Sequence, residues 1–140
     1  MASLQSLETQ GSSEVIVVGA GGCGLTAALA AAQKGSNVLV LEKTNGVGGT
    51  TALSHGGVPG AGTRFQRAEG IEDDPAKFAE EIRQRNSNQS DVKITECLAQ
   101  SSAALVEWLA DTTGVALELS TLNAGHKVRR SHAWGWGEAL

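Results

Sequence analysis

Three glycines spaced as GxGxxG, at positions 19, 21 and 24, constrain the fold of this chain more than any other feature. The run EVIVV just before them predicts a buried strand, and the alanine-rich stretch from about Gly22 to Lys34 predicts a helix. NVLVL at 37–41 predicts a second strand, buried like the first on both faces. The order strand, helix, strand predicts an α/β, Rossmann-like fold, here partial, with a parallel sheet and flanking helices.

The glycines of such a turn have separate physical roles. The first permits the tight turn out of the strand, the second lets the backbone approach a pyrophosphate, and the third lets the helix pack closely on the sheet. Backbone N–H groups at the helix N-terminus then point at the phosphates. The residues expected to bind there are Gly19, Ala20, Gly21, Gly22, Cys23 and Gly24, with a backbone role only for the cysteine. A turn that binds nothing is the alternative, and the ordered strand, helix, strand and acid disfavour it.

An acidic residue, Glu42, ends the second predicted strand. A carboxylate at this place accepts both ribose hydroxyls of an adenosine and repels a 2′-phosphate, which disfavours NADP. The alternative is a glutamate solvated at the sheet edge. On the GxGxxG motif alone, an NAD-dependent dehydrogenase also stays open.

The region from Lys43 to Gly70 is rich in glycine and has neither helical nor strand periodicity. Irregular segments of this length are usually functional, so we expect a ligand to organise this one. Beyond it, Asp74 and Pro75 predict the start of a helix that ends near residue 86. An apolar stripe that includes Leu98 and Leu105 predicts a second helix at 91–111, and a strand is expected at 115–119.

Two further glycine pairs follow the acid, Gly48-Gly49 and Gly56-Gly57, within EKTNGVGGTTALSHGGVPGAGT. The stretch resembles the fumarate reductase and succinate dehydrogenase flavoprotein family, especially its soluble members and the related 3-ketosteroid dehydrogenases. The resemblance covers about residues 14–135. It implies FAD as the cofactor and, for the complete enzyme, an FAD-dependent oxidoreductase that reduces or forms an activated C=C bond beside a carboxylate or ketone.

The resemblance also implies which residues bind FAD. One pair matches the adenosine-ribose contacts, the next four residues run along the pyrophosphate and ribityl chain, and the last group passes beside the isoalloxazine ring. Glycines and short hydroxyl residues suit this task because they offer donors without bulk. The three groups are Glu42 and Lys43; Gly48, Gly49, Thr50 and Thr51; and Ser54, Gly56 and Gly57.

One histidine lies in this stretch. Some members of the family attach FAD covalently through a histidine, but the matching position here is Thr50. We therefore expect non-covalent FAD, and expect His55 to be a partly buried hydrogen-bonding residue near the cofactor. No catalytic residue is assigned, because nothing in the chain matches the family's proton-transfer residues.

Basic side chains gather at two places. Arg64 and Arg67 either contact substrate or pair with nearby acids at 69, 72 and 73, and solvated surface charge is the commoner case. A second group near the end suits a carboxylate ligand, because guanidinium groups match dicarboxylates. Solvated surface charge is again the favoured interpretation. This second group is His126, Arg129, Arg130 and His132.

Composition excludes several classes of function. The net charge is −4 and the basic residues are scattered, so no nucleic-acid partner is expected. Cys23 and Cys97 form neither a metal-ligand spacing nor a disulfide framework, which fits a reducing cytoplasm. No apolar run is long enough to cross a membrane.

The expected partner is a small-molecule substrate of the dicarboxylate or enone type. Residues 1–13 are expected to form a disordered tail, and 14–140 the N-terminal part of an FAD-binding domain. Because the sequence stops in what reads as the first turn of another helix, we expect a truncated chain whose C-terminal half or electron donor is a further partner. An FAD-binding module without catalysis, or an inactive fragment, is the alternative.

Overall fold

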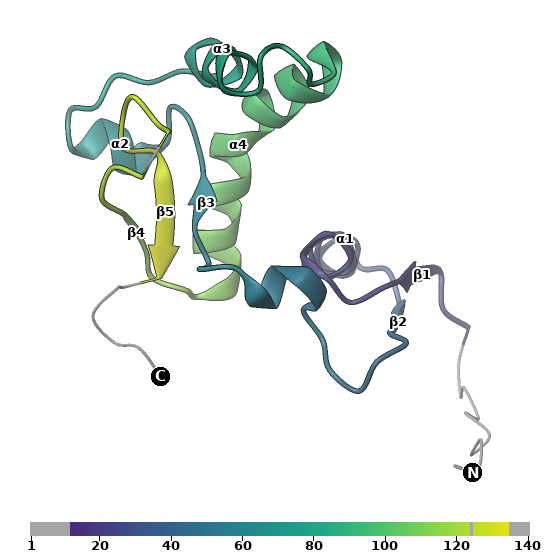
Figure 1. Cartoon of the computed structure of the whole chain (residues 1–140). Helices are drawn as coiled ribbons and strands as arrows, with labels where there is room; N and C mark the ends of the chain where they lie inside the picture. The colour runs from purple at the N-terminus through teal and green to yellow at the C-terminus, as the bar shows by residue number, and fades with distance from the viewer. Residues whose placement is uncertain (1–11, 124, 135–140) are drawn as a thin grey trace. The chain divides into compact units, whose positions relative to one another are not determined.

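The computed structural model describes residues 12–123 and 125–134, and it divides the chain into two compact units with the boundary between His55 and Gly56 (Figure 1). The predicted tail falls largely on residues 1–11, and the predicted final helical turn falls on 135–140, so both lie outside the described residues. The division into a tail and one truncated domain stays a prediction.

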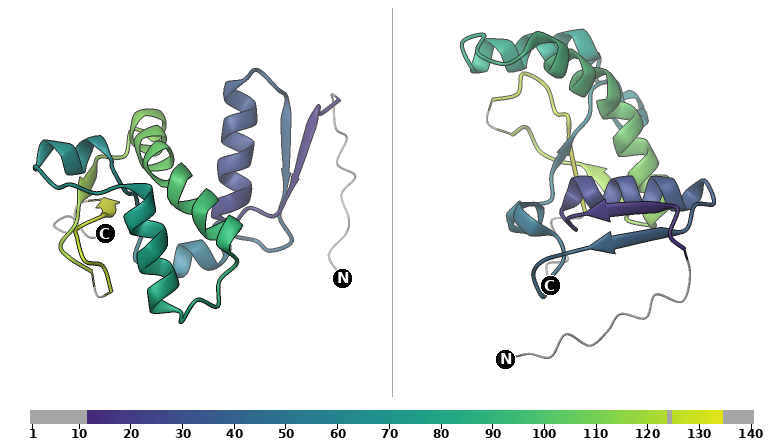
Figure 2. Two further views of the ribbon diagram at one scale, coloured as in Figure 1. Left: turned by 90° about the horizontal axis from the view of Figure 1, so that it is seen from above. Right: turned by 90° about the vertical axis from the view of Figure 1, so that its right-hand side faces the viewer.

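The first unit is a strand, a helix and a strand. It contains β1 (Val15–Val18), α1 (Gly22–Gln33), β2 (Val38–Leu41) and a 3-10 helix, η1 (Gly49–Leu53). The two strands pair in parallel and α1 packs against both, as Figure 2 shows. The predicted partial Rossmann-like fold is confirmed.

The strands are not buried on both faces, and that expectation is wrong. Ile16 is 58% exposed and Val18 83% exposed, whereas Val15 and Val17, which alternate with them along β1, are partly buried. The physical reason is that α1 covers one face of a two-stranded sheet, and no described element of this unit covers the other. The continuous apolar run in the sequence is typical of a strand in a sheet that is covered on both faces.

The second unit combines three helices with an antiparallel sheet. Its elements are β3 (Val58–Pro59), α2 (Arg64–Ala68), α3 (Pro75–Arg85), α4 (Val92–Thr113), β4 (Leu117–Leu119) and β5 (Ser131–Trp134). The sheet order is β3-β5-β4, and α3 packs along α4 (Figure 1). The apolar core of this unit is small and consists of Ala61, Phe78, Ala79 and Ala99.

The two longer helices begin where the sequence predicted. Asp74 caps α3 by accepting the Lys77 N–H at 2.8 Å, and Asp91 caps α4 by accepting the Ile94 N–H at 3.0 Å. The predicted apolar stripe of α4 is partly wrong, because Leu98 is 51% exposed. The residues of α4 that are buried are small or polar: Thr95, Ala99, Ser102 and Val106. Close packing of α3 and β3 on α4 selects these smaller side chains.

The region expected to be irregular contains three short elements, η1, β3 and α2. A capping box begins α2: the Thr63 hydroxyl accepts the Gln66 N–H, and the Gln66 side chain accepts the Thr63 N–H. Periodicity cannot reveal so short a helix, although the spacing of threonine and glutamine could have. Of the helices described, none has the length and apolar character needed to cross a membrane.

Candidate cofactor-binding site

The turn from β1 into α1 needs glycine at its first and third motif positions. Gly19 has φ +99°, in the left-handed region, and its N–H donates to the Leu41 carbonyl at 2.7 Å. A Cβ on Gly24 would lie 1.9 Å from the Gly19 carbonyl oxygen, a distance that no side chain permits. The predicted roles of both glycines, in the turn and in close packing, match this geometry.

Two glycine elements far apart in the sequence lie side by side in the first unit. Gly21 and Gly48 form an isolated parallel bridge, and the Gly48 N–H donates to the Ala20 carbonyl at 2.6 Å. Gly48 has φ +105°, and a Cβ there would lie 2.7 Å from the Ala52 methyl. The first turn of α1 and the start of η1 therefore present one continuous backbone surface.

This surface offers hydrogen-bond donors. The N–H groups of Cys23 and Gly24, in the first turn of α1, have no protein acceptor among the residues that the structure describes. The helix macrodipole adds partial positive charge at the same place. An anion such as a pyrophosphate fits this arrangement, because it accepts hydrogen bonds and favours a positive field.

Glu42 binds the glycine turn directly. Its Oε2 accepts the Ala20 N–H at 2.8 Å, and its Oε1 accepts the N–H and the hydroxyl of Thr44, each at 2.9 Å. The Ala20 N–H is the largest cause that lowers the pKa of Glu42 to about 2, followed by the Thr44 N–H and hydroxyl. The carboxylate is therefore ionised at neutral pH and held against the turn.

These contacts restrict what Glu42 can accept from a ribose. A carboxylate has about four acceptor positions, two on each oxygen. The Ala20 N–H takes one position on Oε2, and the Thr44 N–H takes one on Oε1. The Thr44 hydroxyl has a single hydrogen and also lies 2.8 Å from the Gly46 carbonyl, so both carboxylate oxygens can accept a ribose hydroxyl when that hydrogen is donated to Gly46. The role of Thr44 was missed from the sequence.

Most other predicted residues are exposed. Thr51 is among them, and its hydroxyl accepts the Gly22 N–H at 3.2 Å. Ser54 follows η1 as its C-cap, and Gly57 belongs to the second unit, where it leads into β3. The exposed predicted residues are Cys23, Lys43, Gly49, Thr50, Thr51, Ser54, Gly56 and Gly57.

His55 is exposed, so the expected partly buried side chain is wrong. It lies in a run of exposed residues, 49–57, and none of these residues is buried.

The basic group near the end is not a solvated cluster, and that favoured interpretation is wrong for two of its members. Arg130 is 1% exposed and His132 is fully buried. Arg130 pairs in bidentate fashion with Asp73 at 2.9 Å and reaches Glu81 at 2.7 Å, and it stacks over the Phe78 ring. Burial acts to lower the pKa of Arg130, but the hydrogen bonds and charges of these acids raise it overall.

The carboxylate-ligand alternative fails for a related reason, because the acids of the protein already occupy the cations. Arg130 is occupied as above, Arg129 pairs with Glu69, and His126 lies 3.0 Å from Glu81. A guanidinium that is bound on both sides has no face left for a dicarboxylate.

Arg64 and Arg67 of α2 are exposed, as predicted for surface charges, but the predicted acidic partners at 69, 72 and 73 are wrong. Arg64 forms a bidentate pair with Asp111 at 2.6 and 2.9 Å, and Arg67 lies 3.5 Å from Glu107. Both partners are on α4, because the helical conformation of α2 turns these side chains toward it.

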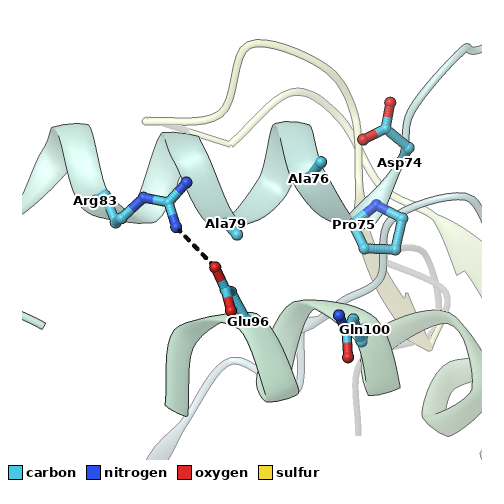
Figure 3. Close-up of a pocket in the computed structure, with 7 residues that line it drawn as sticks. All are labelled: Asp74, Pro75, Ala76, Ala79, Arg83, Glu96 and Gln100. Atoms are coloured by element: carbon cyan, nitrogen blue, oxygen red, sulfur yellow. Dashed lines mark ion pairs between the residues drawn. The ribbon is translucent and has the colours of Figure 1, made fainter. Parts of the chain in front are cut away.

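An open groove of about 500 Å³ lies between α3 and α4, and Figure 3 shows its lining. Its arginine, Arg83, pairs with Glu96 at 3.6 Å and with Glu80 at 3.0 Å. Asp74, also in the lining, pairs with Lys77 at 3.4 Å. Since each charged side chain of the groove has a protein partner, we assign no ligand to it.

A parallel strand, helix and strand with a glycine turn at the helix N-terminus and a carboxylate after the second strand defines the dinucleotide-binding α/β class. Within it, the chain belongs to the family described as "FAD binding domain", which matches residues 14–138. FAD is therefore its cofactor, and the glycine turn, where a Cβ on Gly24 or Gly48 would lie within 3 Å of other atoms, fits this cofactor.

The most informative relatives are reductases and dehydrogenases. The chain is 36% identical to "NADH:fumarate oxidoreductase" of Klebsiella pneumoniae over 91% of the chain and 14% of that protein. It is 40% identical to "Urocanate reductase" of Eggerthella lenta over 84% of the chain and 20% of that protein.

Solved structures agree with these relatives. The open conformation of a flavocytochrome c3 fumarate reductase superposes with a TM-score of 0.81 at 36% identity, over 90% of this chain and 22% of that one. A 3-ketosteroid-Δ4-(5α)-dehydrogenase from Rhodococcus jostii gives a TM-score of 0.64 at 34% identity, over 76% of this chain and 22% of that one. The chain thus spans about a fifth or less of the curated relatives named above.

Proposed function

We propose that this chain is the FAD-binding portion of an oxidoreductase that reduces or forms an activated C=C bond beside a carboxylate or ketone. The cofactor is held non-covalently, since Thr50 stands where covalent members of the family have a histidine. The substrate is a small dicarboxylate or enone, and the rest of the active site and an electron donor come from further polypeptide. The cytoplasm is the proposed location.

One observation carries this proposal: the bridge between Gly21 and Gly48, closed by Glu42 against Ala20. It joins the GxGxxG turn, the Gly48-Gly49 pair and the ribose acid into one backbone surface, and only the joint arrangement separates a flavin site from an isolated glycine turn. The relatives named for fumarate and urocanate support the substrate class.

Each part of this surface has a task. The N–H groups of Cys23 and Gly24 hold the pyrophosphate, and the open acceptor positions of the Glu42 carboxylate accept the ribose hydroxyls. The negative charge of Glu42 excludes a 2′-phosphate. The backbone of Gly56 and Gly57 is proposed to lie beside the flavin. Bound FAD would supply hydride transfer to or from the substrate carbon, and this chain binds and orients it.

The visible absorption spectrum tests this function. The purified chain is reconstituted with FAD, freed of excess cofactor, and measured before and after precipitation with trichloroacetic acid. We expect flavin bands that move entirely to the supernatant, as non-covalent binding requires. Gly24→Ala should abolish them because its Cβ meets the Gly19 carbonyl, whereas Gly46→Ala, with nothing within 4 Å, should retain them. A colourless parent that binds NAD instead would refute the cofactor assignment.

A non-catalytic module or an inactive fragment is the second candidate, and the exposed face of β1 favours it. Ile16 and Val18 leave apolar surface that further polypeptide would have to cover. Stoichiometric flavin without reduction of any acceptor would indicate the module. Aggregation, with binding of an apolar dye, would indicate the fragment.

A further inference from the structure

Gly56 and Gly57 are the flavin-side glycines, because their backbone is proposed to lie beside the flavin. The segment that follows Gly57 is held in place by β5. Gly57 runs directly into β3, where Val58 pairs with His132 and Pro59 with Ser131. The next N–H, of Gly60, donates to the Arg130 carbonyl at 2.8 Å. Gly57 itself is so close to β5 that a Cβ on it would lie 2.7 Å from the Ser131 hydroxyl. The position of this glycine backbone therefore depends on β5.

One imidazole bridges the two ends of this segment. The His132 ring is fully buried, with Nδ1 3.3 Å from the Val58 carbonyl and Nε2 2.9 Å from the Thr63 hydroxyl. Val58 and Thr63 are the first and last residues of the stretch between the glycine pair and α2. A side chain that holds both ends limits the conformations of everything between them.

The hydrogen bonds determine the tautomer of this ring. The Val58 carbonyl can only accept, so Nδ1 carries the proton and donates it. In the neutral ring Nε2 is then an acceptor and takes the Thr63 hydroxyl hydrogen, while the Thr63 oxygen accepts the Gln66 N–H. Both nitrogens are used, and the ring also packs against Phe65 with centroids 5.4 Å apart.

We propose that His132 is a positioning residue for the flavin-side glycines, acting through its hydrogen bonds to Val58 and Thr63. The inference rests on the proposed function, because it assumes that the flavin lies beside Gly56 and Gly57. Backbone N–H groups that meet the flavin stabilise the negative charge of its reduced form, and such contacts weaken steeply when the donor is misplaced. Loosening β3 therefore weakens binding of reduced flavin more than binding of oxidised flavin.

Two substitutions separate the bonds of the ring. His132→Asn keeps an amide donor near the place of Nδ1, and His132→Gln keeps a polar group near the place of Nε2. Each variant is reconstituted with FAD, and its flavin midpoint potential and FAD dissociation constant are measured. We expect His132→Gln to bind reduced flavin about tenfold more weakly relative to oxidised flavin, which lowers the potential by about 30 mV for a two-electron couple. His132→Asn, which keeps the bond to Val58 and loses the bond to Thr63, should lower the potential by a smaller amount.

A matched control separates positioning from general destabilisation. Asp91→Ala removes the side-chain cap of α4, which accepts the Ile94 N–H at the start of that helix, so it should destabilise the second unit and leave the potential unchanged. Equal shifts in this control and in both His132 variants would overturn the proposal, as would a parent-like potential in folded His132→Gln. If the His132 variants do not fold, Thr63→Val should lower the potential and Thr63→Ser should not; equal values in the two would overturn it.

Amide hydrogen exchange tests the same role without cofactor. The amides of Gly57, Val58 and Gly60 should exchange faster in His132→Gln than in the parent, while those of α3 should not change. If the parent fails to take up FAD, the proposed function fails, and unchanged exchange at these three amides would separately overturn the positioning role.

Discussion

In the first unit, the turn into α1 leaves backbone donors without a protein acceptor, whereas in the second unit the central charges are buried and fully paired. Cys23 and Gly24 present their N–H groups at the helix start, and nothing described accepts them. Arg130, by contrast, has its guanidinium bound by both Asp73 and Glu81, with all three side chains at most 6% exposed. The first arrangement is ready for a ligand, and the second has no capacity left for one.

The difference shows how to weigh polar groups that a sequence brings together. Arginines and histidines near the end of the chain suggest a binding site for a carboxylate ligand, but in the fold they pair with acidic side chains of the protein itself. Glycines suggest only a turn, yet they create the unsatisfied donors. Unsatisfied hydrogen-bonding capacity, more than charge, marks the candidate site.

The largest effect should come from breaking the buried charge network of the second unit. Arg130→Met leaves Asp73 and Glu81 buried without their cation, which should destabilise this unit by about 3–5 kcal/mol. Arg129→Met, at the neighbouring position, removes an exposed pair with Glu69 and should change stability by about 1 kcal/mol or less. Urea unfolding of both variants measures the contrast. Similar losses would mean that burial of the network contributes nothing.

A slightly smaller effect should come from filling the glycine turn of the first unit. Gly24→Ala places a Cβ against the Gly19 carbonyl and should destabilise this unit by about 3 kcal/mol, the upper end of overpacking effects. Gly46→Ala is the control, since it meets nothing within 4 Å. Hydrogen exchange should speed up in β1 and β2 but not in β5. Faster exchange in β5 as well would show that the two units do not unfold separately.

Mild acid should weaken the second unit before the first. Burial is the main cause that lowers the pKa of His132 below 6.5, although the Val58 and Arg130 backbones and the charge of Glu107 on α4 oppose it. The neutral ring therefore stabilises the fold above pH 6.5, and this stabilisation is lost as the pH falls through the lowered pKa. Glu42 acts in a lower window: its stabilisation is full above 4.5 and is lost as the pH falls to about 2.

Between pH 6.5 and 4.5, amide protection relative to the intrinsic exchange rate at each pH should therefore fall in β5 and not in β2. His132→Gln removes the titrating group and should abolish this loss of protection. A loss that persists in this variant would assign the acid sensitivity to another residue.

Local chemistry made the first unit predictable. GxGxxG between two β-branched runs, with an acid after the second, specifies a strand, helix and strand within a few residues of one another, and the helix caps at Asp74 and Asp91 are equally local. The pairing of Gly21 with Gly48, the bonds of Glu42 to Ala20 and Thr44, and the burial of Arg130 depend on contacts across the fold. Pattern alone holds no information about such contacts.

The smallest effect on stability should come from relieving backbone strain, which also differs between the two units. Among the described residues of the first unit every positive φ belongs to a glycine, but in the turn between α3 and α4 Ser87 has φ +56° and Asn88 +59°. A left-handed conformation costs a residue with a Cβ about 1 kcal/mol, and asparagine tolerates it better than serine. Ser87→Gly should therefore stabilise the second unit by about 0.5 kcal/mol, after the entropy that glycine loses on folding. Asn88→Gly should have a smaller effect, and urea midpoints compare the two. If Ser87→Gly is destabilising instead, the turn is not strained, and the two units do not differ in this respect.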